Sequence, residues 1–230
     1  MGQCFSAAAQ DVTQQQQGAS SSAAVPHAAA ATGTTGLSPL YPSLPAGAEK
    51  VLVRNVYDGD TLTLVDERRV RFLGIDTPEI KEKQPFAEQA KAYTKDLCHK
   101  QEIWISYEPG QDTKDHYGRL LCFAWVKQGN NYLCVNEGIV QAGLANAYIP
   151  NSNAKLHNWD KILALQDQAR EAKKGLWSTF KDFTVYKTAN GAAYHKKDCR
   201  HLSNSHNLTQ LKASQAAAQG LHPCRTCLAD

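Results

Sequence analysis

Three short motifs combine acids and arginines at spacings that suit chemistry: DGDT at 58–61, RFLGIDTPE at 71–79 and DHYGR at 115–119. The second motif is unusual because Arg71 lies inside an apolar run that ends in two acids. A solvated strand end would explain the acids, but it would not explain an arginine in a segment that the pattern expects to be buried. The three motifs are therefore candidates for one shared site.

Each motif supplies a different chemical group. Asp60 and Asp76 offer the hard carboxylate oxygens that a divalent cation prefers, with a backbone carbonyl and water completing its shell. Arg71 and Arg119 are permanently charged and can each hold a phosphate through two hydrogen bonds. Glu79 would then be free to take a proton from water. We expect these five side chains to share one pocket.

The formal charges explain why all of these groups would be needed. The three carboxylates carry −3, which alone would repel a phosphodiester, whereas a divalent cation and two arginines add +4. The net charge then suits an anion and stabilises charge that develops on phosphorus. Taken singly, DGD is typical of a hairpin turn and a strand arginine is typical of a solvated edge. Only the combination favours a site.

The elements that must position the motifs follow from the apolar pattern. Five strands are predicted, at 50–57, 61–65, 68–75, 102–107 and 119–126. Three helices are predicted: one that Pro85 opens, one near 135–142 that Gly143 ends, and one over 155–174 that Gly175 ends. This order predicts an α+β fold, mainly β, built on a five-stranded OB-fold barrel with three helices.

At these three motifs the sequence resembles the staphylococcal nuclease (thermonuclease) family, over roughly residues 50–180. The resemblance implies a five-stranded OB-fold barrel with three helices. It also implies an endonuclease that hydrolyses DNA and RNA with calcium and cuts the P–O5′ bond to leave 3′-phosphates.

The resemblance also implies a role for each residue. The positions that match the family's calcium ligands are Asp60, Asp76 and the backbone carbonyl of Thr77. Arg71 and Arg119 match its phosphate-binding arginines, and Glu79 matches its proposed general base. Tyr117 resembles the tyrosine beside the bound phosphate, and Tyr148 a base-stacking tyrosine.

The sequence departs from the bacterial pattern in two places. The segment after Gly143 is shorter, and the loop between Glu79 and Pro85 lacks a lysine-rich insertion. Base stacking and substrate preference are therefore the parts that transfer least directly. Some relatives keep the barrel, lose the catalytic residues and only bind, so the alternative is a membrane-tethered, non-catalytic adaptor for nucleic acid or protein. The presence of all five charged residues favours an enzyme.

The C-terminal segment, residues 181–230, contains two pairs of metal-binding residue types. His195 and Cys199 form an H-x3-C pair, and Cys224 and Cys227 form a C-x2-C pair. A predicted helical stretch at 208–219 separates them. Imidazole and thiolate are the donors that tetrahedral zinc prefers, and a short segment with few large apolar residues needs such a staple. We therefore predict a small zinc-binding module.

Alternatives to this zinc site remain. The C-x2-C pair would also suit a redox pair, the cysteines would also be compatible with free thiols, and His201, His206 and His222 compete with His195 as the imidazole ligand. The pattern resembles an H-x3-C…P-C-x2-C module appended to some bacterial nucleases of the same family and, more distantly, the zinc module of Ada-type DNA-repair proteins. The segment has seven basic and three acidic residues, which favours binding of nucleic acid.

The first 48 residues contain no Lys or Arg and are rich in Ala, Ser and Gln, which predicts a flexible tether before a catalytic domain at 49–180. The tether begins MGQCFS, where Gly2 fits N-myristoylation and Cys4 fits S-palmitoylation. Two acyl chains give stable anchoring where one does not. We expect a lipid-anchored monomer on the cytosolic face of a membrane, with the plasma membrane as the expected one. The alternative is a chance pattern on a soluble protein.

The remaining cysteines agree with a reducing compartment. The total of seven is odd and shows no dense disulfide spacing. Cys98, Cys122 and Cys134 lie among apolar residues and are interpreted as small buried hydrophobic side chains. No apolar run is long enough to predict a transmembrane helix.

Overall fold

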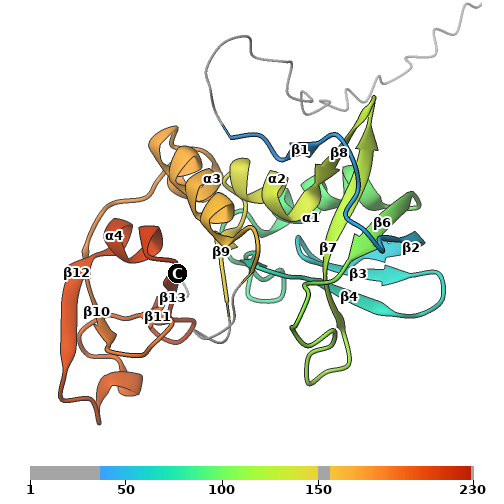
Figure 1. Cartoon of the computed structure of the whole chain (residues 1–230). Coiled ribbons are helices and arrows are strands. Elements are labelled where there is room, and N and C mark those ends of the chain that lie inside the picture. The colour runs from blue at the N-terminus through green and yellow to red at the C-terminus, as the bar shows by residue number, and fades with distance from the viewer. Residues whose placement is uncertain (1–36, 150–155, 229–230) are drawn as a thin grey trace, which may run out of the picture. The chain divides into compact units, whose positions relative to one another are not determined.

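The computed structural model describes residues 37–149 and 156–228 (Figure 1). The lipidation motif at Gly2 and Cys4 therefore lies outside the described residues. Among the residues that are described, no helix is both long and apolar enough to cross a membrane.

Five strands close into a barrel. They are β2 (Glu49–Val56), β3 (Thr61–Leu64), β4 (Arg69–Phe72), β6 (Glu102–Ser106) and β7 (Leu120–Gln128). Their order is β7-β4-β3-β2-β6, and β6 pairs again with β7 to close the ring. The β4–β7 pairing is parallel and the other four are antiparallel. This closed ring confirms the predicted OB-fold barrel, within a few residues at each strand end.

The barrel encloses the main hydrophobic core. Its largest fully buried side chains come from several strands and include Leu62, Phe72, Ile103, Phe123 and Trp125. Each such side chain stabilises the fold by roughly 1.5–3 kcal/mol relative to an exposed one. The core thus fixes the strand ends that carry the acidic and basic motifs.

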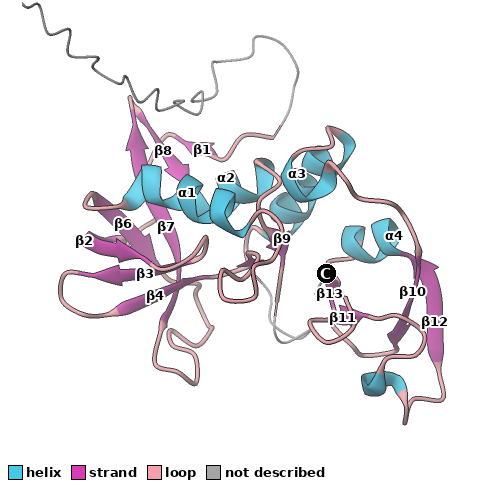
Figure 2. Ribbon diagram, turned by 180° about the vertical axis from the view of Figure 1, so that it is seen from behind, coloured by secondary structure: helices cyan, strands magenta, loops and turns pink. Residues whose placement is uncertain are grey.

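Three helices lie beside the barrel, and Figure 2 shows them in a row along it. They are α1 (Ala87–Cys98), α2 (Val135–Gln141) and α3 (Trp159–Glu171). Gly143 follows the end of α2, as predicted. The prediction for α3 is wrong at its end, because α3 stops at Glu171 and Gly175 instead opens the 3₁₀ helix η1 (Gly175–Trp177). A side chain on Gly143 would lie 2.4 Å from the Lys174 carbonyl oxygen, and one on Gly175 would lie 2.3 Å from the Gly143 carbonyl oxygen. Glycine is therefore required where the end of α2 meets the start of η1.

Part of the expected N-terminal tether packs on the barrel. The strand β1 (Leu40–Tyr41) pairs with β8 (Asn131–Cys134), a strand that the sequence pattern did not reveal. The Tyr41 ring lies 5.0 Å from the Trp125 ring, and its hydroxyl donates to Glu137 Oε1 at 2.5 Å. The prediction of a tether over residues 1–48 is therefore wrong for residues 37–48. The reason is that the few large apolar side chains there find partners on the barrel.

The C-terminal segment is built from short strands. β10 (Thr184–Thr188) pairs with β12 (Leu208–Lys212), and β11 (Ala193–Tyr194) pairs with β13 (His222–Pro223). The helix predicted over 208–219 is wrong in its first half, because β12 finds a hydrogen-bonding partner in β10. Only α4 (Ala213–Ala218) is helical.

Short contacts join this segment to α3. The Gln166 side chain donates to the Ala217 carbonyl at 3.1 Å and accepts from the Ala147 N–H at 2.8 Å, so one buried amide links both parts. A side chain on Gly220 would lie 2.6 Å from the Trp159 ring. The segment therefore packs directly against the helix that follows the candidate active-site strands.

Candidate active site

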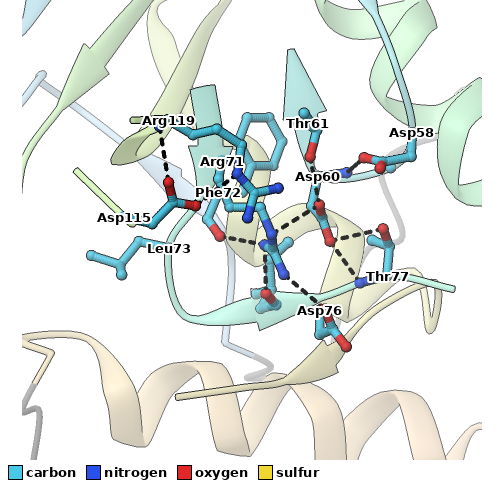
Figure 3. Close-up of polar contacts among 12 residues, drawn as sticks. Asp58, Asp60, Thr61, Arg71, Phe72, Leu73, Asp76, Thr77, Asp115 and Arg119 are labelled. Carbon is cyan, nitrogen blue, oxygen red and sulfur yellow. Dashed lines mark hydrogen bonds and ion pairs between the residues drawn. The ribbon is translucent and has the colours of Figure 1, made fainter. Parts of the chain in front are cut away.

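The buried guanidinium of Arg71 is stabilised because hydrogen-bond acceptors surround it. Its Nε lies 3.2 Å from Asp60 Oδ1, and its Nη2 lies 2.7 Å from Asp76 Oδ1 (Figure 3). Its Nη1 donates to the carbonyls of Phe72 and Ile75 at 2.7 and 2.8 Å. Only 9% of the residue is exposed. One buried arginine thus draws both predicted cation ligands towards a single point.

Asp60 is tied to the segment that carries Thr77. Its Oδ2 accepts from the Thr77 N–H at 2.8 Å and from the Thr77 hydroxyl at 2.9 Å, and its Oδ1 accepts from the Thr61 hydroxyl at 3.1 Å. Asp76 lies next to Thr77 in β5 (Ile75–Asp76), where it pairs with Asn146 of β9 (Asn146–Ala147). These contacts bring the DGDT and RFLGIDTPE motifs together.

Asp58 is a member of the cluster that the sequence analysis did not single out. Its Oδ1 accepts the Asp60 N–H at 3.1 Å. Burial, followed by the negative charge of Asp60, raises the pKa of Asp58 to about 7. With this pKa the carboxyl is partly protonated at neutral pH, which lowers the negative charge around Asp60. The sequence offered a signal for Asp58, because it is the first residue of the DGDT motif that also contains Asp60.

Glu79 is half-buried and lines the same cleft as Asp76 and Thr77. Its backbone N–H donates to Gln84 Oε1 at 2.8 Å, which holds the residue in place. Among the described residues its carboxylate receives no hydrogen bond. Burial, followed by the charge of Asp60, raises the pKa of Glu79. A carboxylate with spare acceptor oxygens and a raised pKa suits the role of a proton acceptor.

Arg119 lies on the same face of the sheet as Arg71. In the parallel pairing of β4 with β7, Arg71 lies opposite Leu121, and Arg119 comes two residues earlier, so the two arginine side chains project from one face. Arg119 Nε lies 2.7 Å from Asp115 Oδ2, and its guanidinium is 5.4 Å from the Tyr117 ring. The structure thus pairs Arg119 with Asp115 rather than with the two central aspartates.

The two predicted substrate tyrosines lie in different surroundings. Tyr117 is 73% exposed. Tyr148, which follows β9, contacts the C-terminal segment: its ring lies 4.6 Å from the His222 ring and 5.7 Å from the Arg225 guanidinium. Arg225 also reaches the cluster, with Nη2 2.5 Å from Asp76 Oδ1. Arg225 is one of the seven basic residues of the C-terminal segment.

The oxygen donors fit a divalent cation such as calcium. Asp60 and Asp76 both contact the one guanidinium of Arg71, so their carboxylates lie close together, and Thr77, which follows Asp76, binds Asp60 through its N–H and hydroxyl. Carboxylate and carbonyl oxygens are the donors that calcium and magnesium take. The residues that would hold such an ion are Asp60, Asp76 and the Thr77 carbonyl.

The four predicted zinc ligands form a second group. One ligand atom from each of His195, Cys199, Cys224 and Cys227 lies within 4.8 Å of the others. The Cys199 and Cys224 Sγ atoms are 3.9 Å apart, close to the edge of a tetrahedron with Zn–S bonds of about 2.3 Å. His195 Nδ1 is buried without a hydrogen-bond partner among the described residues. The donor set and its spacing fit zinc, and His195, rather than its three rivals, accompanies the cysteines.

A closed OB-fold barrel carries carboxylates and arginines at its strand ends, an arrangement suited to binding a cation and a phosphate. The family model for staphylococcal nuclease homologues matches residues 69–179. The chain belongs to the staphylococcal nuclease family, and it is accordingly a nuclease-type hydrolase.

The relatives include proteins from several bacteria. The thermonuclease of Staphylococcus hyicus is 32% identical over 141 residues, which cover 58% of this chain and 78% of the relative. An uncharacterized endonuclease of Escherichia coli O157:H7 is 34% identical over 142 residues, 60% of this chain and 82% of the relative. The thermonuclease of Staphylococcus intermedius is 32% identical over 139 residues, 56% of this chain and 76% of the relative.

Proposed function

We propose that the chain is a calcium-dependent endonuclease that hydrolyses phosphodiester bonds in DNA and RNA and leaves 3′-phosphate ends. The observation that carries this proposal is the contact of one buried arginine, Arg71, with both Asp60 and Asp76, beside a cleft that Glu79 also lines. Calcium dependence is general in the staphylococcal nuclease family, and the oxygen donors fit that ion.

The residues divide the chemistry between them. Glu79 takes a proton from the attacking water, and its raised pKa makes it a better base than an ordinary carboxylate. As the water oxygen bonds to phosphorus, the P–O5′ bond breaks, the 5′ oxygen leaves and takes up a proton from the surrounding water, and the phosphate stays on the 3′ side. Arg71 and Arg119 bind the phosphate oxygens, and Arg71 is held in orientation by two carbonyls before substrate arrives. Bound calcium would supply positive charge to the phosphate and its nucleophile.

The protein would contact the bases of the substrate strand as well as its phosphates. Tyr117 is 73% exposed beside Arg119, so its ring is available to the nucleotide whose phosphate Arg119 binds. Tyr148 offers a second aromatic face beside Asp76 through its contact with Arg225. Stacking on such rings tolerates any base, in keeping with action on both DNA and RNA.

End-labelled DNA and RNA oligonucleotides test this proposal. The expected result is cleavage of both with added calcium, weaker cleavage with magnesium, and products whose mobility changes on phosphatase treatment because they end in a 3′-phosphate. A non-catalytic adaptor would bind the same oligonucleotides and leave them intact with either cation, which would refute the enzyme.

A lipid anchor completes the proposal. Gly2 would carry a myristoyl group and Cys4 a palmitoyl group, holding the enzyme on the cytosolic face of a membrane, with the plasma membrane as the expected one. Gly2→Ala removes the acceptor of the first chain, so the protein should move from the membrane fraction to the soluble fraction of its host cell. An unchanged membrane fraction would rule out the myristoyl anchor.

The C-terminal ligand group would hold one structural zinc ion. We expect native mass spectrometry to find one zinc per chain, and we expect His195→Ala to lose it while His206→Ala, at a rival and exposed histidine, keeps it. A zinc-free chain whose Cys224 and Cys227 are joined in a disulfide would instead indicate a redox pair.

A further inference from the structure

The C-terminal segment brings a third arginine into the candidate active site. Arg225 Nη2 lies 2.5 Å from Asp76 Oδ1, the same oxygen that Arg71 Nη2 reaches at 2.7 Å. Asp76 is thus shared by an arginine from the barrel and one from outside it. The two arginines differ in exposure: the Arg71 side chain is 11% exposed and that of Arg225 is 56% exposed. Arg71 is fixed by its buried contacts, whereas more than half of the Arg225 side chain faces solvent.

Arg225 and Asp76 line a single cleft of about 400 Å³. Asp76 and Glu79 come from the barrel, and the other wall comes from segments that follow α3, including Trp177 and Phe180. The cleft therefore joins the acidic cluster to a guanidinium and aromatic side chains, which are the groups that bind a nucleotide's phosphate and base.

We propose that the segment after residue 180 forms the second wall of the substrate cleft, and that Arg225 binds the phosphate of a nucleotide next to the one that is cut. This inference rests on the proposed nuclease function. An ion pair with a guanidinium as exposed as that of Arg225 is worth little in water. Replacing the Arg225–Asp76 ion pair by a contact between Arg225 and a substrate phosphate therefore costs little free energy. The guanidinium gains a partner that it can bind through two hydrogen bonds.

Hydrogen bonds hold the chain on both sides of Arg225, so its loop is fixed in position. The Cys224 N–H donates to the Tyr194 carbonyl at 3.0 Å, and the Cys227 Sγ accepts the Lys196 N–H at 3.3 Å. Arg225 lies between these two cysteines. The proposed zinc ligands would thus position a substrate-binding residue as well as stabilise their own segment.

The chain contains a matched control for Arg225. Arg200 follows Cys199 directly, as Arg225 follows Cys224, and it is likewise exposed, but it does not line the cleft. A loss of oligonucleotide affinity that occurs only on replacing Arg225 therefore indicates binding in the cleft. An equal loss on replacing Arg200 would indicate binding to a general basic surface.

The test is equilibrium binding of a fluorescein-labelled single-stranded oligonucleotide of mixed sequence to the full chain, at several salt concentrations and without added divalent cation. We expect Arg225→Ala to weaken binding by about 10-fold or more. We also expect it to reduce the slope of log K against log salt by about 0.7, the value for one phosphate contact on a single strand. Arg225→Lys should keep the slope, and Arg200→Ala should stay close to the wild type. If Arg225→Ala fails to fold, Arg225→Gln is the test variant, because it removes the positive charge and keeps a polar side chain, and the same loss of affinity and slope is expected.

Two outcomes would overturn the inference. Equal losses in Arg225→Ala and Arg200→Ala would show that no particular arginine matters, and tighter binding by Arg225→Ala would show that Arg225 blocks the cleft. Failure of the nuclease proposal is seen separately: a wild-type chain that never cleaves, yet binds in an Arg225-dependent way, would support the second wall while removing the enzyme.

Discussion

Replacing Arg71 with alanine should both inactivate the enzyme and destabilise the barrel. The change leaves Asp60 and Asp76 without their shared buried partner and removes the donor to the carbonyls of Phe72 and Ile75. We expect the free energy of unfolding to fall by about 3–5 kcal/mol. Cleavage by the folded fraction should fall by about 100-fold or more, because a preorganised donor to the phosphate is lost.

Urea unfolding and cleavage rates measure the two effects, and Arg54→Ala is the control. Arg54 also lies on a barrel strand and pairs with an acid, Glu67, but both side chains are more than half exposed. Its loss should cost no more than about 1 kcal/mol and leave cleavage unchanged. If Arg71→Ala were as stable as Arg54→Ala, the buried network would not have the importance assigned to it.

Replacing Glu79 with glutamine should remove most of the activity and leave the fold intact. Glutamine keeps the size of the side chain, and the hydrogen bond to Gln84 uses only the backbone N–H, so it survives. Loss of the general base should lower kcat by about 100- to 10,000-fold. Glu82→Gln is a matched control, because Glu82 is an exposed acid on the same loop that contacts Gln84 through the Gln84 side chain.

The pH dependence of the wild type gives an independent check on Glu79. A base must be deprotonated to act, so activity should be lost as the pH falls through the pKa of Glu79. Because burial and Asp60 raise that pKa, the loss should begin at a higher pH than for an ordinary glutamate. If the loss of kcat/KM at low pH were unchanged in Glu79→Gln, the group that titrates there, and hence the base, would be a residue other than Glu79.

The barrel was predictable because local signals agreed with the global fold. The strands are apolar and bounded by turns, the glycines lie where helix ends meet, and the acidic motifs sit at strand ends. The site could be predicted from residue types. Arg71 lies in an apolar run that the pattern expects to be buried, and a buried arginine is stable only where acids or other acceptors surround it. The contact of Arg71 with Asp60 and Asp76 agrees with this expectation.

The parts that were missed depend on contacts between distant segments. Residues 208–212 have the composition of a helix, but pairing with β10 makes them a strand. Residues 40–41 look like part of a tether, but β8 pairs with them. Arg225 lies 149 residues from Asp76 along the chain. No local pattern reveals such a contact, because it is set by how the C-terminal segment packs against α3.

Nicking of supercoiled plasmid by the purified full chain tests the central claim most directly. With calcium present the wild type should convert the plasmid to open-circular and then shorter forms. EDTA should stop this and added calcium should restore it, while Glu79→Gln should nick at least about 100-fold more slowly than the wild type. Cleavage that persists in EDTA, or plasmid that is bound and left intact at every calcium concentration, would contradict a cation-dependent nuclease centred on Asp60, Asp76 and Arg71.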